Sequence, residues 1–236
     1  MKKQSDPICF GGLSQETLKL IACVTMLLDH IGAVFSPGSV LRDIGRLSFP
    51  IFCFLLSEGF YHTRSRGRYA LRLFVSMLLA EIPFDLAFFG RIYWGHQNVM
   101  LTLLLGFLAI WTMTEVKDGI AKGLITAGFV IAAEYLRSDY GGTGVILILM
   151  FAMTREMPGK NWIRTALVLL LFAGMSSVVV FRVGTFAVTQ QMLGTFAMIP
   201  IALCSGEKKT GSKALQTAFY LFYPVHLMTL YLITGC

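Results

Sequence analysis

The chain has 236 residues, of which 56% are hydrophobic and only 14% are charged, and its formal net charge is +7. Soluble domains carry roughly 25% charged residues, so the composition excludes an ordinary soluble domain. It predicts an all-α fold, a polytopic helix bundle embedded in a lipid bilayer.

About nine transmembrane helices are expected, because long stretches lack Asp, Glu, Lys and Arg and a spanning helix needs roughly 17–25 apolar residues. In chain order the expected ranges are 14–35, 44–63, 68–90, 98–116, 120–138, 142–154, 163–181, 187–204 and 213–234. Ser14 is expected to cap the first helix, with Glu16 in its first turn. We expect a single domain, 1–236. No C-x-x-C pattern occurs, so neither a metal site nor a disulfide framework is expected.

The distribution of positive charge predicts the orientation of the helices. All but five of the 20 Lys and Arg fall in the N-terminal segment or in the even-numbered loops. Since cytoplasmic segments carry the excess of Lys and Arg, the N-terminus is expected in the cytoplasm and the C-terminus outside. This placement also accounts for the net charge, so nucleic acid is not expected as a partner.

The first expected helix carries an acid and a histidine side by side, Asp29 and His30, in its outer half. Ionisable residues at membrane depth usually face a cavity and mark a functional site. We interpret His30 as functional, with a packed, hydrogen-bonded histidine as the structural alternative. Adjacent residues on a helix do not face each other, so Asp29 is expected to point elsewhere, toward an arginine such as Arg46.

More polar side chains are expected at the same depth on later helices. They are Arg46, Glu81, Asp85, Asp139 and His226. Together they predict one hydrated cavity in the outer half of the bundle, with Pro224 loosening the last helix beside His226. The structural alternatives are snorkelling side chains at helix ends and an interhelical pair between Asp85 and Arg46.

At the inner end of the second expected helix, Glu58 and His62 lead into a basic run that contains Arg64, Arg66 and Arg68. One interpretation is charge that sets the topology and attracts anionic lipid. The other is a binding site for a phosphate-rich cytosolic donor, because arginine binds phosphate in bidentate fashion.

Seven segments spread over most of the chain resemble the TraX family. They read Thr25-x-x-x-Asp29-His30-Ile31-Gly32, Ile44-Gly45-Arg46-Leu47-Ser48-Phe49-Pro50-Ile51-Phe52, Glu58-Gly59-Phe60-x-His62-Thr63-Arg64, Glu81-Ile82-Pro83-Phe84-Asp85, Asn98-Val99-x-Leu101-Thr102-Leu103, Asp139-Tyr140-Gly141 and Tyr223-Pro224-x-His226-Leu227. That family is named for conjugative-plasmid proteins implicated in acetylating the amino terminus of a pilin subunit. It is similar to the integral-membrane acyltransferases of the family-three type, which carry an essential histidine late in their first helix and an arginine eleven positions before it.

The resemblance implies an acetyltransferase in the cytoplasmic membrane of a bacterium, with acetyl-CoA as co-substrate and a protein or glycan acceptor. His30 matches the essential histidine, and Lys19 stands where the arginine is expected. His30 would act as general base, assisted by Asp29, or would carry the acetyl group itself. Lys19, Glu58, His62 and the three arginines would bind the donor.

Two other classes of function remain open from the residues. A proton-coupled transporter would also use acids and histidines at depth, although the chain lacks the internal repeat of many transporters. A non-catalytic scaffold for a conjugation or surface-assembly complex would explain the many helices but not the polar residues among them.

Overall fold

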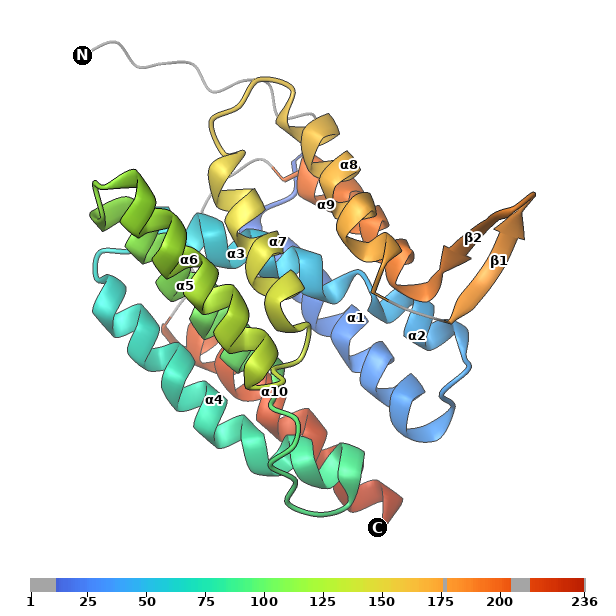
Figure 1. Ribbon diagram of the computed structural model, residues 1–236. Coiled ribbons are helices and arrows are strands. Elements are labelled where there is room, and N and C mark those ends of the chain that lie inside the picture. The colour runs from blue at the N-terminus through green and yellow to red at the C-terminus, as the bar shows by residue number, and fades with distance from the viewer. Residues whose placement is uncertain (1–11, 176–177, 205–212, 236) are drawn as a thin grey trace.

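The computed structural model describes residues 12–175, 178–204 and 213–235 of the chain. Its elements are α1 (Gln15–Phe35), α2 (Val40–Gly45), α3 (Ser48–His62), α4 (Arg66–Phe89), α5 (Val99–Glu115), α6 (Gly119–Tyr135), α7 (Gly141–Met153), α8 (Lys160–Ala173), β1 (Val179–Val183), β2 (Phe186–Thr189), the 3₁₀ helix η1 (Gln190–Ala197), α9 (Met198–Ala202) and α10 (Lys213–Thr234) (Figure 1). The all-α class is confirmed, with one two-stranded hairpin added.

Side-chain caps fix where several helices begin. The Ser14 hydroxyl accepts a hydrogen bond from the Thr17 amide at 3.1 Å, as predicted. Asn98 caps α5 and Asp118 caps α6 in the same way. Each cap satisfies an amide that the first helical turn leaves without a partner.

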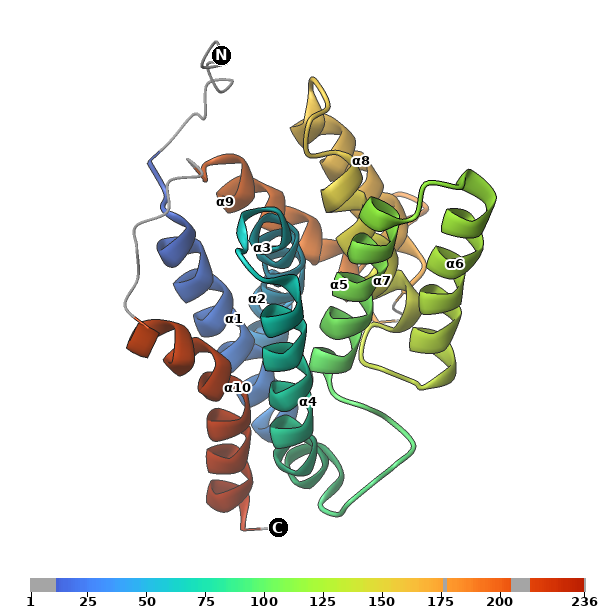
Figure 2. The same ribbon diagram turned by 90° about the vertical axis from the view of Figure 1, so that its left-hand side faces the viewer.

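The helices pack around α3, which contacts α1, α5 and α7. On one side α10, α1 and α4 lie next to one another, and on the other side α6 and α7 cover α5 (Figure 2). The main apolar core contains Ile51, Phe107, Ile148 and Phe172. A second apolar cluster, formed by Met26, Ala80, Phe84, Tyr223 and Leu227, joins α1, α4 and α10.

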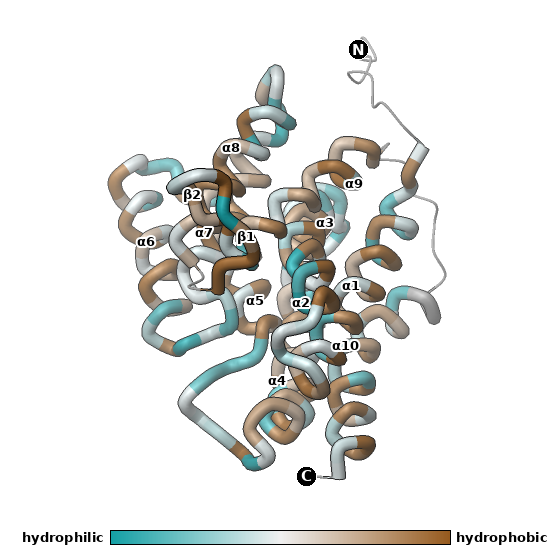
Figure 3. The backbone as a smooth tube through the Cα atoms, turned by 90° about the vertical axis from the view of Figure 1, so that its right-hand side faces the viewer, coloured by the Kyte–Doolittle hydropathy of each residue, from teal (hydrophilic) through white to brown (hydrophobic). Residues whose placement is uncertain are grey.

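The helices alternate in direction, so the bundle has two distinct ends (Figure 2). We call one the basic end; it holds Arg64, Arg66, Arg68 and Arg155 at the helix boundaries. The other, the cavity end, is formed by the last turns of α1, α4 and α6 and the first turns of α3, α5 and α7. Figure 3 shows hydrophobic residues along the helices and hydrophilic residues mainly in the loops between them.

Of the nine expected helices, one extends too far and one is not a continuous helix. The helix expected over 163–181 ends at Ala173, where Gly174 follows, and the next residues form the β1–β2 hairpin with Arg182 opposite Ala187. The helix expected over 187–204 is β2, η1 and α9 in succession. Freedom from charge does not distinguish strand from helix, whereas a run of β-branched and aromatic residues favours a strand. Gly184, with φ 60°, provides the turn.

The second expected helix, 44–63, is divided into α2 and α3, with Arg46 and Leu47 between them. Within the described residues, α1 and the part of α10 from Gln216 to Thr234 are long and apolar enough to cross a membrane. The other membrane spans remain a prediction.

Candidate functional site

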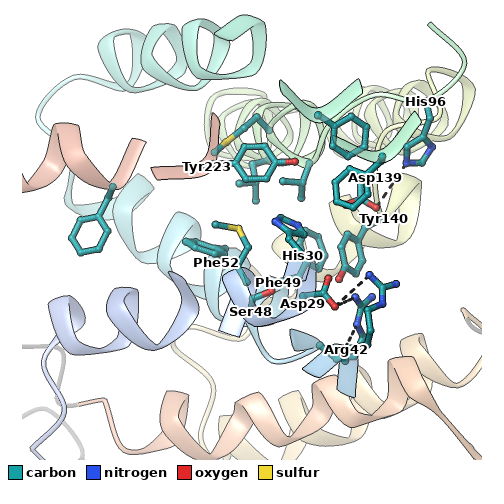
Figure 4. Close-up of a pocket in the computed structure, with 18 of the residues that line it drawn as sticks. Asp29, His30, Arg42, Ser48, Phe49, Phe52, His96, Asp139, Tyr140 and Tyr223 are labelled. Carbon is teal, nitrogen blue, oxygen red and sulfur yellow. Dashed lines mark hydrogen bonds and ion pairs between the residues drawn. The ribbon is translucent and has the colours of Figure 1, made fainter. Parts of the chain in front are cut away.

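A cavity of about 240 Å³ lies between α1, α2, α3, α4, α5 and α10, toward the cavity end (Figure 4). Its wall is largely aromatic, with Phe49, Phe52, Phe84, Phe88, Phe89, Tyr140, Phe219 and Tyr223. The ionisable groups that line it are Asp29, His30, Arg42, Arg46, His96 and Asp139. An apolar pocket with a few convergent polar groups is the usual form of a small-molecule site.

His30, in the cavity wall, is in contact with His226, although 196 positions separate them in the chain. Nδ1 of His30 lies 2.6 Å from Nε2 of His226, and the two rings are nearly parallel, at 10°. Nδ1 of His226 lies 2.6 Å from the carbonyl oxygen of Phe222. His30 lines the cavity, whereas His226 is buried behind it. The structure therefore answers a question that the sequence left open: the two histidines belong to one site.

Asp29 turns away from His30 and binds two arginines of the α2 region. Its carboxylate accepts a hydrogen bond from Arg46 and lies 3.5 Å from Nη1 of Arg42. Arg46 also donates to the Arg42 carbonyl and to the Gln191 side chain, both at 3.2 Å. The expected Asp29–Arg46 pair is confirmed, and the alternative Asp85–Arg46 pair is wrong.

Gly45 makes this arrangement possible. A Cβ atom at position 45 would lie 2.2 Å from the Cβ of Asp29, closer than real Cβ atoms approach. Only a glycine lets α2 lie so close to α1 that Arg46 reaches the Asp29 carboxylate.

The loops before α5 and before α7 bring Asp139 and His96 to the cavity. The Asp139 amide donates to the Gln97 carbonyl at 2.9 Å, and the Gln97 amide donates to the Arg137 carbonyl at 3.0 Å. This backbone pairing places Nε2 of His96 4.0 Å from the Asp139 carboxylate. Burial raises the pKa of the Asp139 carboxyl.

Three residues expected in the cavity lie outside its wall: His226, which is buried behind His30, and the acids Glu81 and Asp85. The Glu81 carboxylate accepts from the amide and side chain of Asn98, and Asp85 accepts from the Tyr93 amide at 2.8 Å. Both therefore hold the α4–α5 loop, because the backbone amides of that loop need partners. The expectation that they line the cavity is wrong.

The residues expected to bind the donor lie mainly at the basic end. Glu58 lies 3.5 Å from His62 and 3.3 Å from Arg155. Arg66 pairs with Glu115 at 2.5 Å, while Arg64 and Arg68 are exposed. Lys19 lies on α1, with Nζ 5.7 Å from the ring centroid of Phe219, a residue of the cavity wall.

Five polar residues of the site were not among the candidate site residues that the sequence predicted. They are Arg42, Ser48, His96, Tyr140 and Gln191. Arg42 and His96 lie near or within loops, where no periodicity indicates a direction. Tyr140 and Gln191 carry no charge, whereas the predicted site residues were selected because their charge makes burial costly. Within the described residues, no group of three or more His, Cys, Asp or Glu is placed to hold a metal ion, and the expectation of no metal remains a prediction.

Comparison with known proteins gives a family and two curated relatives. The family model described as TraX protein matches residues 14–234. A probable fimbrial assembly protein FimC, serogroup H1, of Dichelobacter nodosus is 33% identical over 231 residues, covering 90% of this chain and 92% of the relative. An uncharacterized protein of Rickettsia prowazekii (strain Madrid E) is 42% identical over 152 residues, covering 62% of this chain and 58% of the relative. No solved structure gives a significant match.

Proposed function

This chain belongs to the TraX protein family, and from that premise we propose that it is an integral-membrane acyltransferase. The reaction is transfer of an acetyl group from cytosolic acetyl-CoA to an amine or hydroxyl acceptor. The observation that carries the proposal is the histidine pair at the wall of an aromatic cavity, with His30 lining that cavity.

The exposed surface of the helices supports a protein that spans the bilayer several times. On α4 the exposed large residues include Leu71, Phe74, Val75, Leu78, Leu79 and Ile82. Their spacing puts them on one face of the helix, and that face is covered by no other element of the described chain. In a soluble protein an outward face is polar, so this stripe fits lipid. On α6, Ile120 and Leu124 are 77% and 70% exposed, and fit lipid in the same way.

The proposed chemistry begins with a neutral His30. A ring nitrogen of His30 takes a proton from the acceptor amine or hydroxyl, and the acceptor attacks the thioester carbonyl. The carbon–sulfur bond then breaks, and the thiolate of CoA receives the proton that His30 holds. General-base catalysis of this kind requires the neutral imidazole at the operating pH.

The sequence suggested that Asp29 assists His30 as a base, and we now propose that Asp29 positions two arginines instead. Its carboxylate is engaged by Arg46 and Arg42, so it holds two cations at the cavity wall instead of accepting a proton. Arg42 and Arg46 both line the cavity. Fixed cations there would stabilise the oxyanion that forms when the thioester carbonyl is attacked.

The two ends of the bundle suit the two substrates. Arg64 and Arg68 are exposed at the basic end, where they are free to meet the phosphates of CoA. The pantetheine arm would pass Lys19 and Phe219 to reach the cavity. At the cavity end the acceptor meets Asp139 and His96.

The acceptor is proposed from the relatives. One relative is named as a probable fimbrial assembly protein, which favours the amino terminus of a pilin-like protein. A cell-surface glycan or lipid is the other acceptor class that fits an outward-facing cavity.

The test is transfer of labelled acetyl. Purified protein in lipid nanodiscs is incubated with labelled acetyl-CoA and a membrane extract. Wild type should label an acceptor, and His30→Gln should not. Glu156→Gln is the control, since Glu156 is an exposed side chain with no assigned part in the reaction, and it should retain most of the transfer. Equal labelling by wild type and by a folded His30→Gln variant contradicts the proposal, and no transfer by wild type favours transport or a scaffold.

A further inference from the structure

His30 and His226 form a hydrogen-bonded pair whose proton positions follow from the chemistry of a third group. The Phe222 carbonyl oxygen lies 2.6 Å from Nδ1 of His226. A carbonyl oxygen only accepts, so Nδ1 of His226 carries the hydrogen and donates it.

A neutral imidazole has one N–H and one lone pair. Since Nδ1 of His226 carries the hydrogen, Nε2 of His226 has the lone pair and accepts. Its partner at 2.6 Å is Nδ1 of His30, which must therefore donate. The remaining nitrogen of His30, Nε2, is left with the lone pair.

We infer that His226 is a positioning residue, which holds His30 in the tautomer whose Nε2 is the base. The expected effect of His226 on the reaction rate rests on the proposed function. The tautomer of His30 follows from the hydrogen-bond geometry alone. His226 also fixes the plane of the His30 ring, because the rings lie nearly parallel with centroids 5.0 Å apart. Phe88, edge-on at 5.4 Å, packs against the His30 ring.

The His30–His226 hydrogen bond also stabilises His30 when it becomes protonated. When Nε2 takes the proton of the acceptor, both nitrogens of His30 are donors. Nε2 of His226 still accepts from Nδ1, and the hydrogen bond becomes charge-assisted and stronger. His226 needs no change of protonation for this role, and no proton leaves the pair except the one that CoA receives.

The position of His226 on α10 makes the arrangement rigid. His226 is 7% exposed, and its neighbours Tyr223 and Leu227 belong to the apolar cluster that joins α1, α4 and α10. Phe222, which supplies the carbonyl, lies one turn earlier on the same helix. The tautomer is therefore set by two side chains and one backbone group, all held by helix packing.

The direct test is the tautomer of His30, read from the ¹⁵N chemical shifts of its ring in nanodiscs at a pH where both rings are neutral. The chain has only 4 histidines, so His30 is assigned from the signal that His30→Gln removes. Wild type should show Nδ1–H and an unprotonated Nε2. His226→Leu should release His30 to a mixture with the Nε2–H form. A wild-type His30 in the Nε2–H form overturns the inference, whatever the activity.

A second test separates positioning from structure. His226→Gln keeps an acceptor, because its side-chain carbonyl can replace Nε2 of His226, whereas His226→Leu keeps only bulk. His226→Leu should lower kcat about 10–100-fold, the loss seen when a metal-binding histidine loses the partner that orients it, with KM little changed. His226→Gln should recover most of that loss.

The two tests distinguish the inference from the proposed function. If wild type transfers no acetyl but shows the Nδ1–H tautomer, the function is wrong and the assignment of His226 holds. If wild type transfers acetyl and both His226 variants lose kcat equally while melting like wild type, the positioning role is wrong. A His226→Leu variant with unchanged kcat also overturns it.

Discussion

Removing the carboxylate of Asp29 should destabilise the protein far more than removing a carboxylate from a surface ion pair. The side chains of Asp29 and Arg46 are each 12% exposed, whereas those of Arg66 and Glu115 are 34% and 61% exposed. Breaking a buried pair costs about 3–5 kcal/mol because it leaves a buried charge without a partner. An exposed pair contributes at most about 1 kcal/mol.

In Asp29→Ala, the Arg46 guanidinium keeps its hydrogen bonds to the Arg42 carbonyl and to Gln191 but loses its hydrogen bond to a carboxylate. A chain of this length shifts its melting temperature by about 2–4 °C per kcal/mol. The expected loss is therefore about 6–20 °C for Asp29→Ala and at most about 4 °C for Glu115→Ala.

The assay is thermal unfolding of both variants in the same nanodiscs, followed by intrinsic fluorescence. The double variant Asp29→Ala, Arg46→Leu should recover part of the loss, because it removes the unpaired charge as well. Equal shifts for Asp29→Ala and Glu115→Ala, or no shift for Asp29→Ala, would refute the reasoning that this pair is buried and holds α2 on α1.

Three further predictions concern the backbone contact, the donor and pH. Gly45→Ala should cost about 3 kcal/mol or more, since its Cβ would lie 2.2 Å from the Cβ of Asp29; thermal unfolding measures this. Arg68→Gln should raise the KM for acetyl-CoA, whereas Arg91→Gln, an exposed arginine at the cavity end, should not; steady-state kinetics with both variants decide. Burial raises the pKa of the Asp139 carboxyl, so its stabilising effect is present at low pH and is lost as pH rises above about 4. Asp139→Asn should therefore weaken the fall in melting temperature as pH rises above about 4, and an unchanged pH dependence contradicts this.

Charge and periodicity were enough to locate most helices and one ion pair. The helix that carries Asp29 and His30 was bounded correctly at Ser14, because a capping hydroxyl and an acidic first turn are local signals. The Asp29–Arg46 pair followed from helix geometry, since a side chain next to His30 must point elsewhere.

The sequence does not predict which way a side chain in or beside a loop points. Glu81 and Asp85 lie in the half of α4 nearest the cavity end, as expected, yet they turn to the amides of Asn98 and Tyr93. That choice depends on how the α4–α5 loop folds back. His96 reaches the cavity through the same loop, and no spacing in the sequence predicts it.

The β1–β2 hairpin was not predicted, because the absence of charge favoured a helix. A stretch free of charge satisfies the length test for a spanning helix, and the expected helix was therefore extended to 181. Gly174 and the β-branched run that follows override that signal. The site itself contains residues from α1, α2, α10 and two loops. Which of these elements lie together depends on the packing order of the helices, which the sequence does not give.

The most direct test of the central claim uses sealed vesicles that present the basic end outward. Labelled acetyl-CoA is added outside, with a pilin-like peptide amine enclosed in the lumen. The account predicts that wild type labels the enclosed peptide and that His30→Gln, inserted to the same level, does not. Equal labelling by both proteins, or labelling that requires acetyl-CoA in the lumen, would contradict it.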